Sequence, residues 1–214
     1  MARIQVEGNG RATAAPDEID LQLTVGAVAT EYGTVLEDLN RKVGRLKDAF
    51  VACGVKRTAV KTEDFRVTVD TEYDENRRDR FIGYRGSHQM AVRFPLDRTL
   101  LNALLAECPG SEATPDIAIT FRTNNTEALQ RMALEDAFAA ARKSAEMLAR
   151  SSGCTLGDLV EVLYGERRHP TTLTYRVNQD WGQVDYCKVS YADEIEPEEI
   201  ESSEKVSVTW ELRR

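Results

Sequence analysis

Two long stretches of alternating apolar and polar residues place the strongest constraint on how this chain can fold. The first covers residues 65–73 and the second residues 82–94, with the charged segment ENRRDR between them. In both, apolar and aromatic side chains recur at every second position, which is typical of a β-strand with one buried face. Together they predict a long antiparallel hairpin.

The same alternation predicts shorter strands at residues 4–6, 19–25, 117–121, 159–164 and 206–212. Apolar residues at spacings of three and four predict a helix over 35–50, which Gly54 closes as a left-handed cap. Strands and helices are interspersed along the chain. The predicted fold class is therefore α+β, a mixed or antiparallel β-sheet with long hairpins packed against two long helices and one shorter helix.

Two further helices follow from capping residues. Asp97 is expected to cap a short helix over 100–105. Asn124 and Glu127 resemble a capping box that introduces the longest helix. In that helix, alanines recur at every fourth position and predict close packing against a sheet or another helix; the alternative is a seam between subunits that includes Ala137, Ala141 and Ala145.

Chain length, net charge and cysteine spacing limit which classes of protein this chain can belong to. The 214 residues contain no Pro/Gly/Ser-rich linker, which favours a single domain over 1–214 with a long polar, acidic loop region at 166–203. A net charge of −8 opposes nucleic-acid binding, and no segment has the roughly 18 apolar residues of a membrane span. The four cysteines form no C-x-x-C pair and are expected to be free thiols. These features predict a soluble cytoplasmic protein, or an exported, periplasmic one if a signal peptide has been removed.

The N-terminal segment VEGNGRA, residues 6–12, resembles the start of a dinucleotide-binding motif. That motif needs a third glycine or alanine and then a helix that binds the pyrophosphate. Here Thr13 stands at the third site, and an alternating strand follows. We therefore expect Gly8 and Gly10 to serve a turn or bulge that requires positive φ.

Several motifs, in order, resemble the SIMPL-domain (YggE-like) family. They are V-x-G-x-G at Val6–Gly10, Ala15-Pro16-Asp17, Gly83-Tyr84 at a strand start, the alanine-rich helix with Gly153 after it, and the final V-x-V-x-W-x-L. The resemblance covers nearly the whole chain. It implies an α+β fold. The family is mostly bacterial, and no catalytic residues are established for it. The resemblance also implies links to oxidative-stress defence or large oligomers in some members, and an adaptor role in the eukaryotic namesake.

No constellation in the sequence indicates catalysis, a cofactor or a metal. The two histidines lack zinc-site spacing, and no nucleophile motif accompanies them. His88 shares a strand face with Tyr84 and is expected to be a packed, hydrogen-bonded residue. The alternative is a pocket at Tyr84 and His88 that belongs to an enzyme or small-molecule binder.

The resulting hypothesis is a non-enzymatic protein that associates with itself, with an adaptor for another protein as a further alternative. Aromatic residues are enriched at interfaces, and a long loop that carries several is often functional. The candidate contact residues in the loop region are Tyr175, Trp181, Tyr186 and Tyr191.

Overall fold

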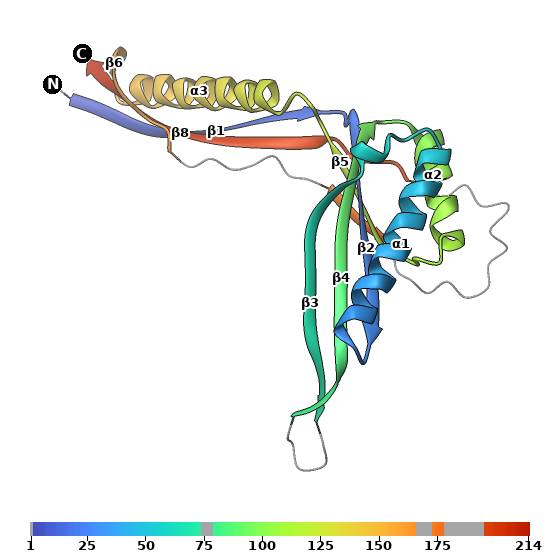
Figure 1. The fold of residues 1–214 in the computed structure, drawn as a ribbon. Helices are drawn as coiled ribbons and strands as arrows, with labels where there is room; N and C mark the ends of the chain where they lie inside the picture. The colour runs from blue at the N-terminus through green and yellow to red at the C-terminus, as the bar shows by residue number, and fades with distance from the viewer. Residues whose placement is uncertain (1, 74–78, 166–172, 178–194) are drawn as a thin grey trace. The chain divides into compact units, whose positions relative to one another are not determined.

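The computed structural model describes residues 2–73, 79–165, 173–177 and 195–214 (Figure 1). The chain divides into two compact units. The first comprises Met1–Pro16, Arg122–Leu173 and Glu198–Arg214, and the second comprises Asp17–Phe121 and Thr174–Pro197. Whether the chain folds as the single predicted domain stays a prediction.

The first unit is a three-stranded sheet with a long helix along one face. The strand order is β1 (Ala2–Ala14), β8 (Ile200–Arg213), β6 (Thr155–Leu163). Both neighbouring pairs are antiparallel, and β1 matches β8 over its whole length, from Ala2 opposite Leu212 to Ala14 opposite Ile200. Helix α3 (Thr126–Ser151) lies along this sheet (Figure 1).

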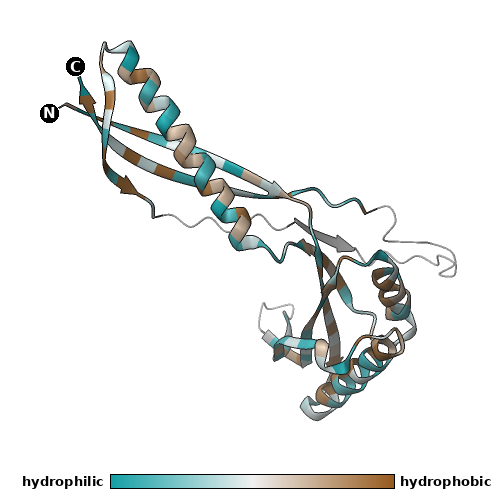
Figure 2. Cartoon of the chain, turned by 90° about the horizontal axis from the view of Figure 1, so that it is seen from above, coloured by the Kyte–Doolittle hydropathy of each residue, from teal (hydrophilic) through white to brown (hydrophobic). Residues whose placement is uncertain are grey.

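Buried and exposed side chains alternate along β1 and β8, and the buried ones form the sheet side of this unit's core. Side chains at even positions are the more buried ones and lie toward α3. Hydropathy alternates accordingly along the two strands (Figure 2). Val206, Val208 and Trp210 pack against the alanines of α3. The small alanine side chains let the helix lie close to the sheet, as the four-residue spacing predicts.

The second unit is a five-stranded sheet with two helices. The strand order is β3 (Lys61–Tyr73), β4 (Asp79–Pro95), β2 (Glu18–Ala29), β5 (Asp116–Arg122), β7 (Leu173–Val177). The helices are α1 (Tyr32–Ala52) and α2 (Arg98–Gly110), and a short 3₁₀ turn, η1 (Arg57–Ala59), precedes β3. The apolar stripe of α1 is buried, and it packs with the inward residues of β2 and β4 in one core cluster.

The structure confirms the α+β fold and several local predictions. Strands β3 and β4 form the long antiparallel hairpin. The Asp97 carboxylate accepts a hydrogen bond from the Leu100 N–H at 3.0 Å and so caps α2. Gly54 follows α1 with a φ of +91°, the left-handed conformation expected of it. Within the described part of the chain, none of the helices has both the length and the apolar character needed to cross a lipid bilayer.

Three local predictions are wrong. Residues 6–12 form no turn, because they lie inside β1, and neither Gly8 nor Gly10 has positive φ. Asn125, rather than Asn124, stands at the N-cap of α3, and its side chain makes no capping hydrogen bond. The region 166–203 is not all loop, because it contains β7 and the first residues of β8. Residues 166–172 and 178–194 lie outside the described residues.

Candidate functional site

The predicted pocket residues Tyr84 and His88 both lie on β4. The Tyr84 ring contacts the rings of Tyr32 and Phe81 edge-on, with centroids 5.6 and 5.3 Å away. Tyr32 and Phe81 are each about half exposed. Tyr84 therefore belongs to an aromatic cluster between the start of α1 and the hairpin.

His88 is a packed, hydrogen-bonded residue, as expected. It is 9% exposed, its Nε2 lies 2.8 Å from the Thr62 hydroxyl, and its ring meets Phe65 edge-on at 5.3 Å. Burial, with a smaller effect of the Lys47 ammonium, lowers the pKa of His88 below its usual 6.5. The buried Nδ1 has no hydrogen-bond partner within the described chain. A pocket at Tyr84 and His88 stays a prediction.

The alanine stripe is not available as a subunit seam. Ala137, Ala141 and Ala145 are all 0% exposed and are covered by strands of their own unit. The prediction that they contact another subunit is therefore corrected. They face the chain's own sheet because β1 presents glycines there.

The aromatic residues of the loop region fall largely outside the described residues. Tyr175 lies in β7, at the outer position of the five-stranded sheet. Trp181, Tyr186 and Tyr191 lie in the part that is not described. Their role as contact residues stays a prediction.

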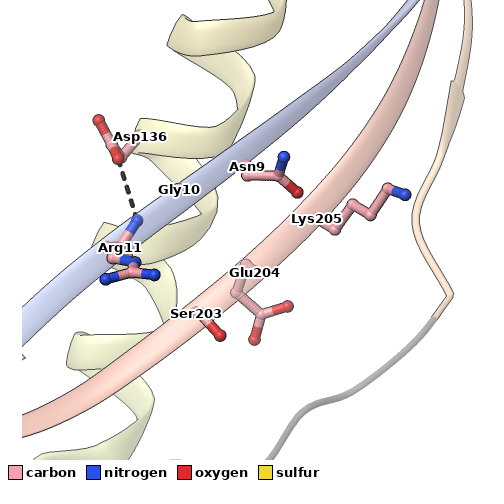
Figure 3. Close-up of a pocket in the computed structure, with 7 residues that line it drawn as sticks. All are labelled: Asn9, Gly10, Arg11, Asp136, Ser203, Glu204 and Lys205. Atoms are coloured by element: carbon pink, nitrogen blue, oxygen red, sulfur yellow. Dashed lines mark hydrogen bonds between the residues drawn. The ribbon is translucent and has the colours of Figure 1, made fainter.

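A polar hollow of about 490 Å³ opens where α3 crosses β1 and β8 (Figure 3). Its lining residues are Asn9, Gly10, Arg11, Asp136, Ser203, Glu204 and Lys205. Arg11 is paired with Glu201 at 3.3 Å and Lys205 with Glu7 at 2.8 Å, so the positive charges are already neutralised. This pairing disfavours an anion site. Across the described residues, no cluster of three or more His, Cys, Asp or Glu could hold a metal ion.

Inside this hollow, two contacts have a structural role. Asp136 of α3 accepts the Arg11 backbone N–H at 3.0 Å and thereby occupies one backbone donor of β1 (Figure 3). The carboxylate of Glu204, which is 2% exposed, accepts hydrogen bonds from Gln130 at 2.9 Å and from the Tyr164 hydroxyl at 3.1 Å. A buried carboxylate needs such donors to remain in an apolar core.

The outer strand β6 is the most apolar exposed strand of the first unit. Four of its side chains are 38–51% exposed, namely Leu159, Val160, Val162 and Leu163. Beside it lies a second hollow, of about 380 Å³. Apolar parts of its lining come from Phe138, Leu156, Leu159 and Trp210, and charged parts from Arg142, Glu146 and Asp158. An exposed apolar strand next to a hollow is suited to contact with another protein.

The outer strand β3 exposes apolar residues in the second unit. Phe65 is 45% and Val69 58% exposed, because α1 packs over β2 and β4 and leaves β3 uncovered. On the opposite face of β3, Arg66 contacts Asp64 at 3.2 Å, and Asp70 accepts from Arg85 at 2.7 Å. This strand thus combines an open apolar face with a face of paired charges.

Sequence reasoning did not identify either outer strand as a contact surface. For β6 a signal exists, because the adjacent pairs Leu159-Val160 and Val162-Leu163 put apolar side chains on both faces of one strand. For β3 no local signal exists. Its alternation matches that of an inner strand, and only the strand order leaves its apolar face open.

Most of the chain matches a family model. The family model SIMPL, described as "Protein of unknown function (DUF541)", matches residues 4–210. No curated protein matches the chain.

Proposed function

The chain belongs to the SIMPL family, whose function is unknown, and from this membership we propose that it is a non-enzymatic protein that associates with copies of itself. The observation that carries the proposal is the exposure of four apolar side chains along β6. Monomeric proteins usually protect an outer strand with Lys, Pro or a covering loop. Strand β6, TLGDLVEVL, carries neither Lys nor Pro.

Two features support a binding role over a catalytic one. The cations of the polar hollow are held in ion pairs, which leaves them poorly suited to bind a charged substrate. The hollow beside β6 has an apolar floor formed in part by Phe138 and Trp210, whose ring centroids are 6.1 Å apart. Apolar pockets of this kind take an anchoring side chain of a partner.

The state of the cysteines bears on the compartment in which the protein works. The described cysteines Cys53, Cys108 and Cys154 are free thiols, which favours a reducing compartment such as the cytoplasm. A role in oxidative-stress response, or as an adaptor, rests on the family resemblance alone.

Sedimentation velocity tests self-association directly. We expect the sedimentation coefficient to rise between roughly 1 and 100 μM protein, the range of typical weak to moderate association. A double variant of β6, Leu159→Ser with Leu163→Ser, should weaken association. The matched control is Met147→Ser on α3, where the replaced side chain is 62% exposed. A monomer at every concentration would refute the proposal.

A second candidate is a small-molecule binder at His88, favoured by its buried Nδ1 without a described partner. A ligand that prefers the native state would raise the melting temperature. A thermal-shift screen tests it, with His88→Gln as the comparison. Loss of the shift in the variant supports this candidate, and a shift that survives in the variant opposes it.

A further inference from the structure

Within the described residues, strand β3 is one of the two outer strands of the five-stranded sheet (Figure 1), and its outer edge is regular over Asp64–Asp70. Its pairing with β4 is in register from Asp64 to Asp70, with shifts only just outside that stretch. A regular outer strand offers unpaired backbone N–H and C=O groups to a further strand. The exposed side chains of Phe65 and Val69 would gain neighbours on one side from the side chains of the added strand.

We infer that the added strand is β3 of a second copy, paired antiparallel about a two-fold axis at Thr68. This inference rests on the proposed self-association and assigns one contact to it. In this register Thr68 lies opposite Thr68 of the second copy, and Val67 lies opposite Val69. Arg66 lies opposite Asp70, and the symmetry makes this pair twice.

Charge complementarity, together with the length of the regular stretch used, favours this register, because its charge pair spans residues 66–70 of that stretch. Side chains directly opposite in an antiparallel pair interact, and like charges there are destabilising. The register centred on Val67 would place Asp64 opposite Asp70, and the one centred on Arg66 would place two guanidinium groups together. The register centred on Thr68 pairs Arg66 with Asp70 inside the regular stretch, and its one like-charge pair, Asp64 opposite Glu72, extends beyond that stretch.

The new pairs would extend contacts that each copy already makes. Arg66 lies 3.2 Å from Asp64, and Asp70 lies 2.7 Å from Arg85. In the proposed register each Asp70 has two arginines and each Arg66 has two aspartates. Such a network is stronger than an isolated surface ion pair.

The two outer strands of the three-stranded sheet suit this pairing less well, and β7, the second outer strand of the five-stranded sheet, has only five residues. One backbone donor of β1 is occupied by Asp136. Strand β6 is shifted against β8 twice, between Leu156 and Leu159 and between Leu159 and Glu161, and such irregularities turn an edge away from a straight partner. Strand β3 is therefore the better edge for strand addition.

A charge-reversal mixture tests the register. Arg66→Glu alone and Asp70→Lys alone each place like charges opposite one another twice, so each should weaken association about tenfold or more. An equimolar mixture of the two variants restores both attractive pairs and should recover most of the wild-type affinity. Sedimentation velocity measures all four samples, and circular dichroism confirms that each variant is folded.

A disulfide gives an independent readout. Thr68→Cys should form an intermolecular 68–68 link under mild oxidation, identified by peptide mass spectrometry, whereas Thr58→Cys before β3 should not. If wild type associates but the mixture shows no recovery and no 68–68 link forms, the register is wrong while self-association stands. If wild type is a monomer throughout, both proposals fail.

Discussion

Gly8 and Ala137 lie so close that a β-carbon on Gly8 would stand 2.0 Å from the Ala137 carbonyl oxygen. One helical turn earlier in α3, the carbonyl oxygen of Ala133 would lie 2.1 Å from a β-carbon on Gly10. The backbone of β1 therefore rests directly on the backbone of α3. The G-x-G segment is explained by this contact between strand and helix, and neither a phosphate site nor a turn is needed.

Gly8→Ala and Gly10→Ala should each lower the free energy of unfolding by about 3 kcal/mol or more, because overpacking against a backbone cannot be relieved by a side-chain rotation. Denaturant unfolding followed by circular dichroism measures the loss. Gly44→Ala is the matched control. It lies inside α1 with nothing within 4 Å of an added β-carbon, and it should raise stability by about 0.5–1 kcal/mol. Unchanged stability in the two β1 variants would contradict the packing.

Gln130→Leu should lower the free energy of unfolding by about 1–3 kcal/mol, because the buried Glu204 carboxylate loses a donor. The same denaturant titration measures it. Gln5→Leu provides the control. It removes an exposed hydrogen bond to Ser207 and should change stability by no more than about 0.5 kcal/mol. Equal effects in the two variants would show that burial of Glu204 is not important.

Regular alternation and helical spacing made most of the second unit predictable. The β3–β4 hairpin and α1 have uninterrupted apolar periods, so local pattern and tertiary environment agree. Strand β1 was predicted too short because Gly8, Asn9 and Gly10 interrupt its alternation. Its glycines are needed for α3, which lies more than 110 residues further along the chain, and no local pattern records that contact.

The surfaces were harder to predict than the core. Alanines at every fourth position indicate close packing, but they do not say whether the neighbour is the same chain or another. The structure identifies the neighbour as the same chain, because Gly8 and Gly10 of β1 lie against these alanines. Exposure of Phe65 and Val69 depends on β3 being an outer strand, and strand order is a property of the whole sheet.

Cys108 should resist alkylation in the folded protein. It is 2% exposed, and burial, with a smaller effect of Glu107, raises the pKa of its thiol to about 12. At pH 8 its thiolate fraction should be roughly a thousandfold below that of an ordinary thiol. Iodoacetamide labelling with peptide mapping measures this, with unfolded protein as the control. Rapid labelling of Cys108 in the native state would contradict the structure.

His88 should make the protein less stable as the pH falls. Because its folded-state pKa lies below the usual 6.5, the unfolded chain takes up the proton first, and the free energy of unfolding drops from near pH 6.5 until the folded-state pKa is passed. His88→Gln removes this titration, so the stability of wild type relative to the variant should fall as the pH drops from about 7.5 and level off once the folded-state pKa is passed. Lys47→Met removes a nearby charge that disfavours protonation, and should make the fall smaller. Melting curves across this range measure both effects. A stability difference between wild type and His88→Gln that does not change with pH would show that His88 is protonated equally in both states.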